Sequence, residues 1–380
     1  MKITDMEVLA TSAGGRTNWT FVKVKTDEGL VGYGEASNWP GSPLVIEGCK
    51  YVHQLLIGEN PNDIDRIWHK LFRYHTYLGS RGVICSIIGG IDIALWDLKG
   101  KALGRPIYDL LGGAHHNAIT LYTHSCGNTP DEIAKHSKCL VDKGFTAIKA
   151  DPFGLIEREI STHYTSGEIS KKAENFGVEC FAAIREAVGP DIDILFDAHG
   201  NYNVPTAIRL THRLAPYNIG WIEEPVPAES YKALAQVRGM SELPICVGER
   251  LFTRYDFIPI LEQGLADYIM PDVTRTGGIS ELRKISNMAE VYHIPVTPHD
   301  ANGSIQILAG AHTMASVPNF YKLEFGVSAL ETYNAVLDRP LDIRDGKLYF
   351  SDRPGLGWEL NEDYIKEHPP VMDISVDSQV

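Results

Sequence analysis

The sequence lacks the features that define several large classes of protein. No run approaches the roughly 18 uncharged apolar residues that a membrane-spanning helix needs, so we expect no membrane segment. The 35 Lys and Arg residues are outnumbered by 49 Asp and Glu, and this net charge of −14 opposes binding to nucleic acid or to an anionic membrane surface. What remains is a soluble globular protein, with an ordinary hydrophobic fraction of 44%.

Two further signals are missing, and both concern the compartment. The first residues, Met1 to Asp5, run straight into a strand-like alternation without the apolar core of a secretory signal. No CxxC spacing occurs, and several of the six cysteines lie in apolar runs, as buried free thiols do (Cys49, Cys85, Cys126, Cys139, Cys180 and Cys246). We therefore expect a cytoplasmic location.

The first third of the chain has the pattern of an α+β domain. Residues 3–35 alternate as an antiparallel meander with a turn at residues 27–29, and residues 43–112 show helical spacing that ends at a pair of glycines. With 380 residues, the chain can hold this domain beside a barrel of roughly 200 to 250 residues. We place the first domain at residues 1–115.

From residue 119 the pattern changes to strands that alternate with helices, mostly at intervals near 25 residues. Eight such units predict a (β/α)8 TIM barrel over residues 116–330, with its active site at the C-terminal ends of the strands. The alternative, a doubly wound open sheet, is disfavoured because no glycine-rich phosphate loop follows the first strand. The predicted strands are Ile119 to Ser125, Thr146 to Asp151, Ile192 to Asp197, Gly220 to Glu224, Pro244 to Glu249, Ala266 to Asp272, Ile294 to His299 and Tyr321 to Phe325.

Two segments depart from this rhythm. The interval between the second and third strands is longer, with a polar stretch at residues 156–175, and an insertion at such a position usually has a functional or assembly role. Residues 331–380 lose the barrel pattern altogether. We expect this C-terminal segment to pack back on the first domain.

Three acidic residues end three consecutive β-branched runs. Asp197, Glu223 and Glu249 are separated by 26 positions in both cases, which is the length of one strand plus one helix. Their carboxylates should therefore lie side by side, where they would repel one another unless a cation were bound. Carboxylate oxygens are hard ligands, so the pattern predicts a Mg²⁺ site and a metal-dependent enzyme.

Two histidines at strand ends complete a candidate catalytic set. Asp272 and His299 end adjacent strands, where the carboxylate can orient the imidazole and raise its basicity, so we predict His299 as a general base. His199 stands two residues beyond Asp197, so strand alternation predicts that it faces the same side, within reach of a substrate hydroxyl.

Further ionisable residues end other predicted strands. Lys149 could be a base or a cation that holds a substrate carboxylate, and Asp151 could be its salt-bridge partner. The remaining strand-end residues are His124, Glu224, Arg250, Asp300 and Glu324.

Several motifs together resemble the enolase superfamily, and within it the mandelate racemase-like group. They are the hairpin Gly29 to Glu35, the helix Ile91 to Lys101, the strand end Trp221 to Pro225, Gly248-Glu249-Arg250 and Pro298-His299-Asp300. The stretch Asp197-Ala198-His199-Gly200 is similar to the galactonate dehydratase-like subgroup.

This resemblance implies a modified barrel whose active site is capped by the α+β domain and the C-terminal tail, with specificity loops near residues 14–19 and 37–43. It implies Asp197, Glu223 and Glu249 as Mg²⁺ ligands, Asp272 and His299 as the basic dyad, Glu324 as an electrophilic acid, and a homo-oligomer. Proton abstraction beside a carboxylate, giving an enediolate that Mg²⁺ stabilises, is the mechanism described for the superfamily. Members of the group usually carry a pair of lysines on the second strand, where this chain has Lys149-Ala150-Asp151. The aspartate in place of the second lysine makes a two-base racemase less favoured.

The predicted function is therefore the Mg²⁺-dependent dehydration of a sugar acid, an aldonate or aldarate, to a 2-keto-3-deoxy acid. His299 would take the C2 proton, and His199 would protonate the departing C3 hydroxyl. Two alternatives stay open: an epimerase, racemase or cycloisomerase of a sugar acid, and a non-catalytic sugar-acid binder.

Overall fold

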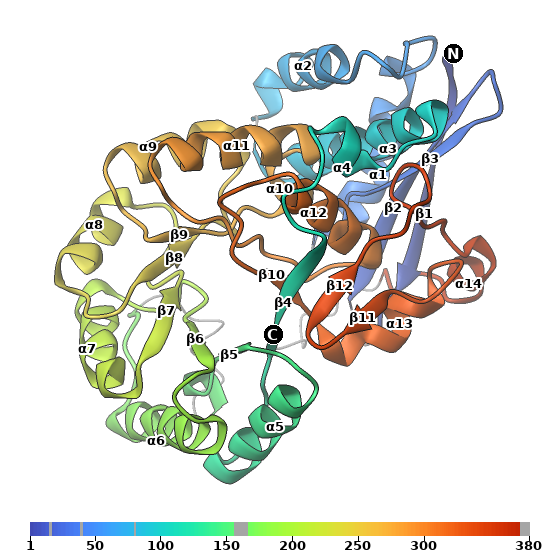
Figure 1. The fold of residues 1–380 in the computed structure, drawn as a ribbon. Helices are drawn as coiled ribbons and strands as arrows, with labels where there is room; N and C mark the ends of the chain where they lie inside the picture. The colour runs from blue at the N-terminus through green and yellow to red at the C-terminus, as the bar shows by residue number, and fades with distance from the viewer. Residues whose placement is uncertain (15–16, 39–40, 80, 156–165, 373–380) are drawn as a thin grey trace.

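The computed structural model describes residues 1–14, 17–38, 41–79, 81–155 and 166–372 (Figure 1). The chain begins with an antiparallel sheet in the order β1-β2-β3, formed by β1 (Ile3–Ser12), β2 (Asn18–Thr26) and β3 (Val31–Glu35). Four helices follow: α1 (Ser42–Val52), α2 (Ile64–Tyr74), α3 (Val83–Leu103) and α4 (Ile107–Leu110). The predicted α+β unit is thus present.

A parallel barrel forms the second part of the fold. Its strands run in the order β4-β5-β6-β7-β8-β9, and β10 closes the ring by pairing in parallel with β4. The strands are β4 (Ala118–His124), β5 (Ala147–Ala150), β6 (Asp193–Asp197), β7 (Ile219–Glu223), β8 (Ile245–Val247), β9 (Tyr268–Ile269) and β10 (Leu323–Phe325). The helices between them are α5 (Pro130–Asp142), α6 (Lys171–Val188), α7 (Val204–Leu214), α8 (Tyr231–Met240), α9 (Thr253–Glu262), α10 (Val273–Thr276), α11 (Ile279–Val291) and α12 (Ser304–Ala315).

The prediction of a strand at residues 294–299 is wrong as a continuous element. This segment contributes a single bridge residue, Val296, which pairs with Ile269 on one side and with Phe320 on the other. Pro295 and Pro298 flank it, and a proline has no N–H to donate to a ladder. The segment therefore closes the ring between β9 and β10 without forming a regular strand.

Two of the barrel helices, α5 and α7, illustrate how a side chain caps the start of a helix. Thr129 accepts a hydrogen bond from the backbone N–H of Glu132 at the start of α5, and Asn203 accepts one from Thr206 at the start of α7 (3.2 and 2.9 Å). In α5 the buried side chains are Ile133, Ser137 and Leu140. This spacing places one face of the helix on the barrel while its other residues face solvent.

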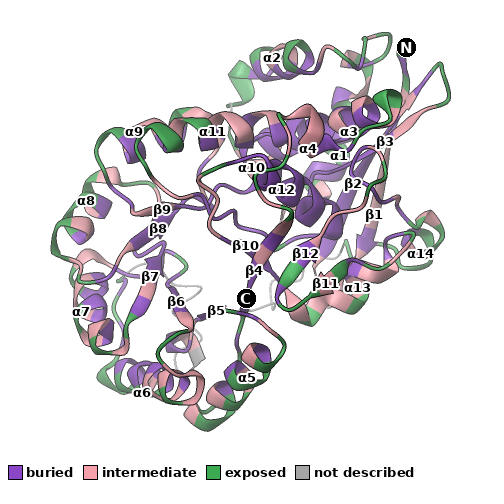
Figure 2. Ribbon diagram, in the orientation of Figure 1, coloured by how far each residue is buried: buried purple, intermediate pink, exposed green. Residues whose placement is uncertain are grey.

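A layer of buried side chains lies just below the strand ends. It consists of Tyr122, Ala147, Leu195, Trp221, Cys246 and Met270. Several of these residues stand two positions before a polar strand-end residue, so strand alternation places both on the same side. Figure 2 shows the barrel strands as buried, whereas the outer faces of the surrounding helices are exposed. The polar site therefore rests on an apolar floor.

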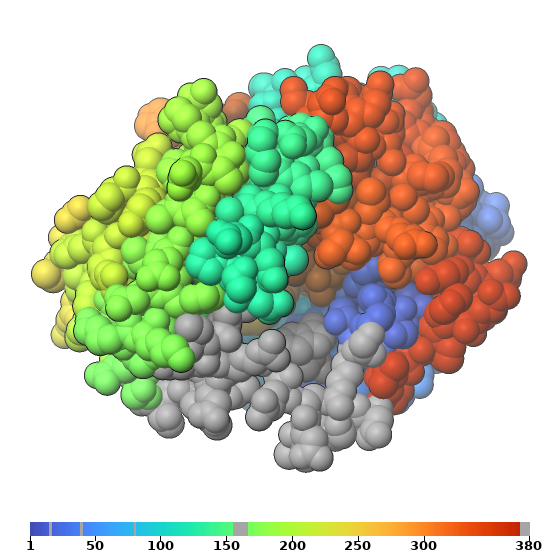
Figure 3. Space-filling view, turned by 90° about the horizontal axis from the view of Figure 1, so that it is seen from below, coloured from blue at the N-terminus to red at the C-terminus, as the bar shows by residue number. Residues whose placement is uncertain are grey.

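The C-terminal segment, which we expected to pack on the first domain, contacts both parts of the fold. Helix α14 (Glu362–Glu367) contacts β1, and Tyr333 of α13 (Leu330–Ala335) stacks on Trp19 with ring centroids 5.2 Å apart. The hairpin of β11 (Asp342–Arg344) and β12 (Lys347–Tyr349) pairs antiparallel with the start of β4. Figure 3 shows the N-terminal and C-terminal residues side by side on one face of the molecule.

Some predicted features lie partly outside the described residues. The two specificity loops include residues 15–16 and 39–40, and the insertion includes residues 156–165, none of which the structure describes. The end of that insertion is helical, because α6 begins at Lys171. In the described part of the chain, no helix has the length and apolar character needed to cross a membrane.

Candidate active site

The three predicted metal ligands lie at the ends of neighbouring strands. Asp197 ends β6 and is in register with Glu223 at the end of β7, while Glu249 follows β8 by two residues. All three side chains are buried. The barrel thus gathers three carboxylates at its C-terminal end, as the 26-residue interval predicts.

Lys149, at the second strand, lies among these carboxylates. Its Nζ is 3.0 Å from Asp197 Oδ2, 2.7 Å from Glu223 Oε1 and 2.6 Å from Glu324 Oε1, and its side chain is only 1% exposed. Burial lowers the pKa of Lys149, but the three carboxylates outweigh burial and raise it well above its usual value. The expectation that Asp151 pairs with Lys149 is wrong, because the ammonium is already shared by three deeper carboxylates.

The carboxylates have the chemistry of a hard-cation site, although their side chains do not converge as they stand. Among the described residues, no three Asp, Glu, His or Cys side chains are grouped closely enough to hold a metal ion. Glu223 turns to Lys149 and to the indole N–H of Trp221, 3.2 Å away. Burial and the charge of Asp197 raise the pKa of Glu223 well above its usual value, so its ionised form needs a further cation. The buried carboxylates of Asp197, Glu223 and Glu249 outnumber the single buried ammonium of Lys149, and such a set of oxygen ligands fits Mg²⁺.

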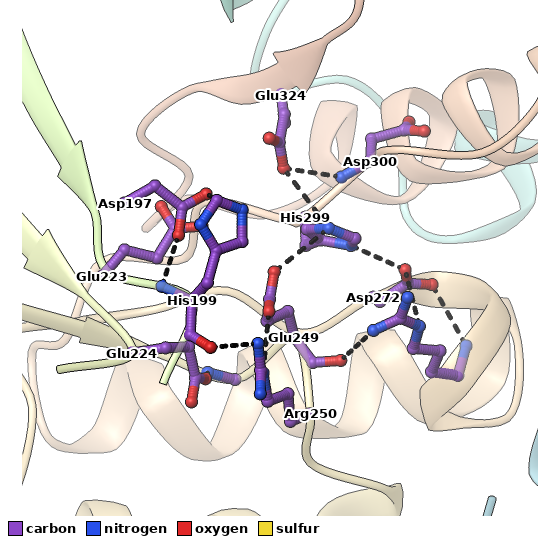
Figure 4. Close-up of polar contacts among 12 residues, drawn as sticks. Asp197, His199, Glu223, Glu224, Glu249, Arg250, Asp272, His299, Asp300 and Glu324 are labelled. Atoms are coloured by element: carbon purple, nitrogen blue, oxygen red, sulfur yellow. Dashed lines mark hydrogen bonds and ion pairs between the residues drawn. The ribbon is translucent and has the colours of Figure 1, made fainter. Parts of the chain in front are cut away.

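His299 and Asp272 form a buried dyad (Figure 4). His299 Nδ1 is 2.8 Å from Asp272 Oδ2, and its Nε2 lies 3.2 Å from Glu249 Oε2. The other oxygen of Asp272 caps α10, where it accepts hydrogen bonds from the backbone N–H and the hydroxyl of Thr274 (2.7 and 2.6 Å). Burial lowers the pKa of His299, but Glu324, Glu249 and Asp272 outweigh it and raise the pKa overall. An imidazole whose Nδ1 is held by a carboxylate presents Nε2 as a base.

His199 forms a second pair with a carboxylate, which is the residue Asp151. Its Nδ1 is 3.0 Å from Asp151 Oδ2, and its Nε2 is 3.4 Å from Asp197 Oδ2. His199 lies on the same side as Asp197, as predicted, but strand alternation is not the cause. Strand β6 ends at Asp197, and His199 adopts a left-handed backbone with φ of 51°. The charge of Asp197, together with the hydrogen bond to Asp151, raises the pKa of His199 to about 10.

Comparison with known proteins identifies the family. The profile of the mandelate racemase / muconate lactonizing enzyme N-terminal domain matches residues 4–112, and that of the enolase C-terminal domain-like family matches residues 132–364. The chain belongs to the enolase superfamily.

Relatives of this enolase-superfamily chain include two named dehydratases. It is 35% identical to a D-xylonate dehydratase of Haloferax volcanii over 97% of this chain and 89% of that protein. It is 36% identical to a D-galactonate dehydratase of Pectobacterium atrosepticum over 92% of this chain and 90% of the relative. A crystal structure of an enolase-superfamily member from Salmonella Typhimurium matches with a TM-score of 0.91 and 31% identity, covering 97% of this chain and 98% of that one.

Glu324, predicted from the family resemblance to be an acid, accepts hydrogen bonds in this structure. Besides Lys149, His124 Nε2 lies 2.6 Å from Glu324 Oε1, and the backbone N–H of Asp300 donates to Oε2 at 3.0 Å. Burial raises the pKa of Glu324, but Lys149, His299 and His124 outweigh burial and hold it well below the usual value. Donation from Glu324 would therefore require a proton from one of these neighbours.

Sequence reasoning assigned no role to three residues that support this enolase-superfamily site: Arg250, Glu35 and the His124 that contacts Glu324. Arg250 donates from Nε to Glu249 Oε1 at 3.1 Å and from Nη2 to the carbonyl of His199. Glu35, at the end of β3, accepts from the backbone N–H groups of Gly303 and Gln306 at 2.6 and 2.8 Å. The signal for Arg250 and for His124 was their position at strand ends, whereas the partner of Glu35 lies 268 residues away in sequence.

Proposed function

We propose that this chain dehydrates a sugar acid, an aldonate or aldarate, to a 2-keto-3-deoxy acid through an enediolate. The observation that carries the proposal is the pair of histidine–aspartate dyads, which both direct Nε2 toward the buried carboxylate group. The names of the two relatives, a D-xylonate and a D-galactonate dehydratase, support the substrate class and the reaction.

His299 acts as the base. Its Nδ1 is held by Asp272, so the lone pair of Nε2 takes the proton from C2 of the substrate. The positive charge formed on the imidazole is stabilised by Asp272, Glu249 and Glu324, which lie within 4 Å of its ring nitrogens. The electron pair of the C2–H bond moves into the carboxylate of the substrate and gives the enediolate.

His199 acts as the acid. Its Nδ1 is paired with Asp151, and from Nε2 it gives a proton to the C3 hydroxyl as the C3–O bond breaks, so that water leaves. The electron pair of the enediolate forms the C2=C3 double bond as the C3–O bond breaks. The resulting enol becomes the 2-keto acid when its C2 hydroxyl loses a proton and C3 gains one. We expect one configuration at C2 to be processed, because His299 is placed as the single base for that proton.

Asp197, Glu223 and Glu249 would hold Mg²⁺. When bound, this ion supplies Lewis-acid stabilisation of the negative charge on the carboxylate oxygens of the substrate. Lys149 adds a fixed positive charge beside Asp197, Glu223 and Glu324, and Arg250 keeps Glu249 in place. We also expect a homo-oligomer, from family resemblance.

The second candidate is an epimerase or cycloisomerase of a sugar acid. The His199–Asp151 pair favours it, because His199 gives the site a second possible proton carrier besides His299. A racemase or epimerase needs such a carrier on each face of the carbanion.

One screen tests the proposal. The Mg²⁺-loaded protein is incubated with D-xylonate, D-galactonate and the complete set of aldonic and aldaric acids, and 2-keto product is measured. We expect at least one acid to give this product. Deuterium at C2 of recovered substrate without a keto product would favour the isomerase, and tight binding without any turnover would favour a non-catalytic binder.

A further inference from the structure

The pair formed by His199 and Asp151 is built differently from an ordinary surface contact. Asp151 directly follows β5, and its Oδ2 lies 3.0 Å from His199 Nδ1. Its other oxygen, Oδ1, is buried and has no hydrogen-bond partner in the described part of the chain. Since a buried carboxylate oxygen without a donor is unfavourable, the position of Asp151 is explained best by its bond to the imidazole.

The imidazole of His199 needs such a partner. Its side chain is 47% exposed, so packing alone does not fix its rotamer, and its left-handed backbone is rare for a residue other than glycine. The backbone is held from two sides: the N–H donates to Asp197 Oδ1 at 3.1 Å, and Arg250 donates to the carbonyl. Among the described residues, Asp151 provides the one side-chain hydrogen bond to Nδ1.

The same arrangement occurs at the buried dyad. In both pairs an aspartate Oδ2 meets histidine Nδ1, and Nε2 then points toward a predicted metal ligand, Asp197 in one case and Glu249 in the other. A carboxylate at Nδ1 selects the tautomer and the ring orientation of a functional histidine. The two dyads therefore direct one nitrogen each at the space where the substrate must bind.

We propose that Asp151 is a positioning residue for the dehydration step: it holds His199 Nδ1 so that Nε2–H faces the departing C3 hydroxyl. The inference rests on the proposed function, because it assigns Asp151 to the leaving group and not to the C2 proton. It also gives a physical meaning to the aspartate that stands where related chains carry a second lysine. At the position where a second lysine could act as a base, this chain instead has a carboxylate that orients the proposed acid, His199.

The expected signature is a split between two rates. Asp151→Asn should lower kcat for dehydration by about 10- to 100-fold, the effect typical of losing a partner that orients a functional histidine. KM and the exchange of the C2 hydrogen with solvent should stay close to wild type, because His299, Asp272 and the carboxylates are unchanged. Asp151→Glu, which keeps the carboxylate, should recover part of the dehydration rate.

A change of leaving group sharpens the test. With a 3-deoxy-3-fluoro analogue of the substrate, fluoride leaves with less need for a proton, so Asp151→Asn should lose much less activity than with the hydroxyl substrate. Asp193→Asn is the matched control, because Asp193 is also paired, with Tyr321 and Lys322, but lies at the opposite end of the barrel. This control should retain both rates.

The experiment uses the Mg²⁺-loaded full chain with D-xylonate and D-galactonate in deuterated water, followed by the remaining acids of the set. Selective loss of dehydration in Asp151→Asn, with recovery in Asp151→Glu and a smaller loss on the fluoro analogue, supports the inference. Wild-type dehydration by Asp151→Asn, or equal losses of exchange and dehydration in a folded variant, overturns it while the proposed function stands. If wild type dehydrates no acid of the set, the proposed function fails and the inference falls with it.

Discussion

The two histidine–aspartate dyads share one geometry but have opposite surroundings. In the inner dyad, the side chains of His299 and Asp272 are 7% and 0% exposed, whereas in the outer dyad those of His199 and Asp151 are 47% and 21% exposed. Asp272 is additionally fixed as the cap of α10, while Asp151 leaves one oxygen without a partner in the described chain. The proposed base is therefore the more buried and more firmly held histidine, and the proposed acid is the more exposed one.

The two dyads are also braced by different parts of the molecule. The loop after His299 is held by the first domain, since Glu35 accepts hydrogen bonds from Gly303 and Gln306, and Gln306 donates to the carbonyl of His299 at 3.4 Å. His199 is braced from within the barrel by Arg250. Changes in the first domain should therefore affect the base before they affect the acid.

The largest effect should come from disrupting the group of proposed metal ligands, toward which both dyads direct Nε2. Glu223→Gln takes away the charge of one of the three proposed metal ligands, so C2 exchange and dehydration should both fall by about 10³-fold or more, since a catalytic metal contributes several kcal/mol. Treatment of wild type with a chelator should have the same effect, and Mg²⁺ should restore activity only in wild type. Full activity in the variant or in the chelated enzyme would contradict the metal assignment.

Asp272→Asn separates the inner dyad from the outer one. Without the carboxylate, His299 loses its orienting partner, and both rates should fall by about 10²–10⁴-fold, the usual contribution of a positioned base. This contrasts with Asp151→Asn, which should spare exchange. Measuring exchange and 2-keto product in the two variants side by side would reveal whether the dyads divide the reaction, and matching profiles would show that they do not.

Lys149→Met should act mainly on stability, whereas the sequence alone suggested that Lys149 is a base or a cation that holds a substrate carboxylate. The substitution leaves three buried carboxylates without their common cation, and breaking a buried ion pair in this way costs about 3–5 kcal/mol of unfolding free energy. Lys171→Met is the control, because Lys171 is 76% exposed and its pair with Glu174 should contribute less than about 1 kcal/mol. Equal midpoints in urea unfolding for the two variants would refute this ranking.

The smallest effect concerns the brace of the inner dyad. Burial raises the pKa of Glu35 from 4.5 to about 7, so the protonated form is favoured on folding. Its contribution to stability is present below about pH 4.5 and is lost as pH rises through 7. Relative to Glu35→Gln, wild type should therefore lose about 1–3 kcal/mol of unfolding free energy over this interval. Parallel curves from urea unfolding at pH 4.5 to 8 would exclude Glu35 as the titrating group.

The comparison also shows what the sequence could and could not predict. Eight strand–helix units were sufficient to predict the barrel, and the regular interval between Asp197, Glu223 and Glu249 placed their carboxylates together, because strand ends in a parallel barrel meet at one edge. Asp272 and His299 followed by the same logic. The partners of Lys149 and Asp151 did not, because they depend on the side-chain rotamers that these residues adopt at the strand ends.

Local backbone conformation and one contact between distant parts of the chain explain the other features that the sequence did not predict. The left-handed conformation of His199 has no sequence signature, and the prolines at 295 and 298 replaced a predicted strand by a single bridge. The contact between Glu35 and α12 joins two distant parts of the chain. Patterns of period and spacing locate strand ends, but they do not report which side chains meet between domains.

The division of labour between the dyads is the central claim, and one experiment tests it most directly. His299→Asn and His199→Asn are compared with wild type in deuterated water, with deuterium at C2 of recovered substrate and 2-keto product measured in the same samples. We predict that His299→Asn loses both signals, whereas His199→Asn loses the product but still incorporates deuterium at C2. Retained exchange in His299→Asn, or equal loss of both signals in the two variants, would contradict the account.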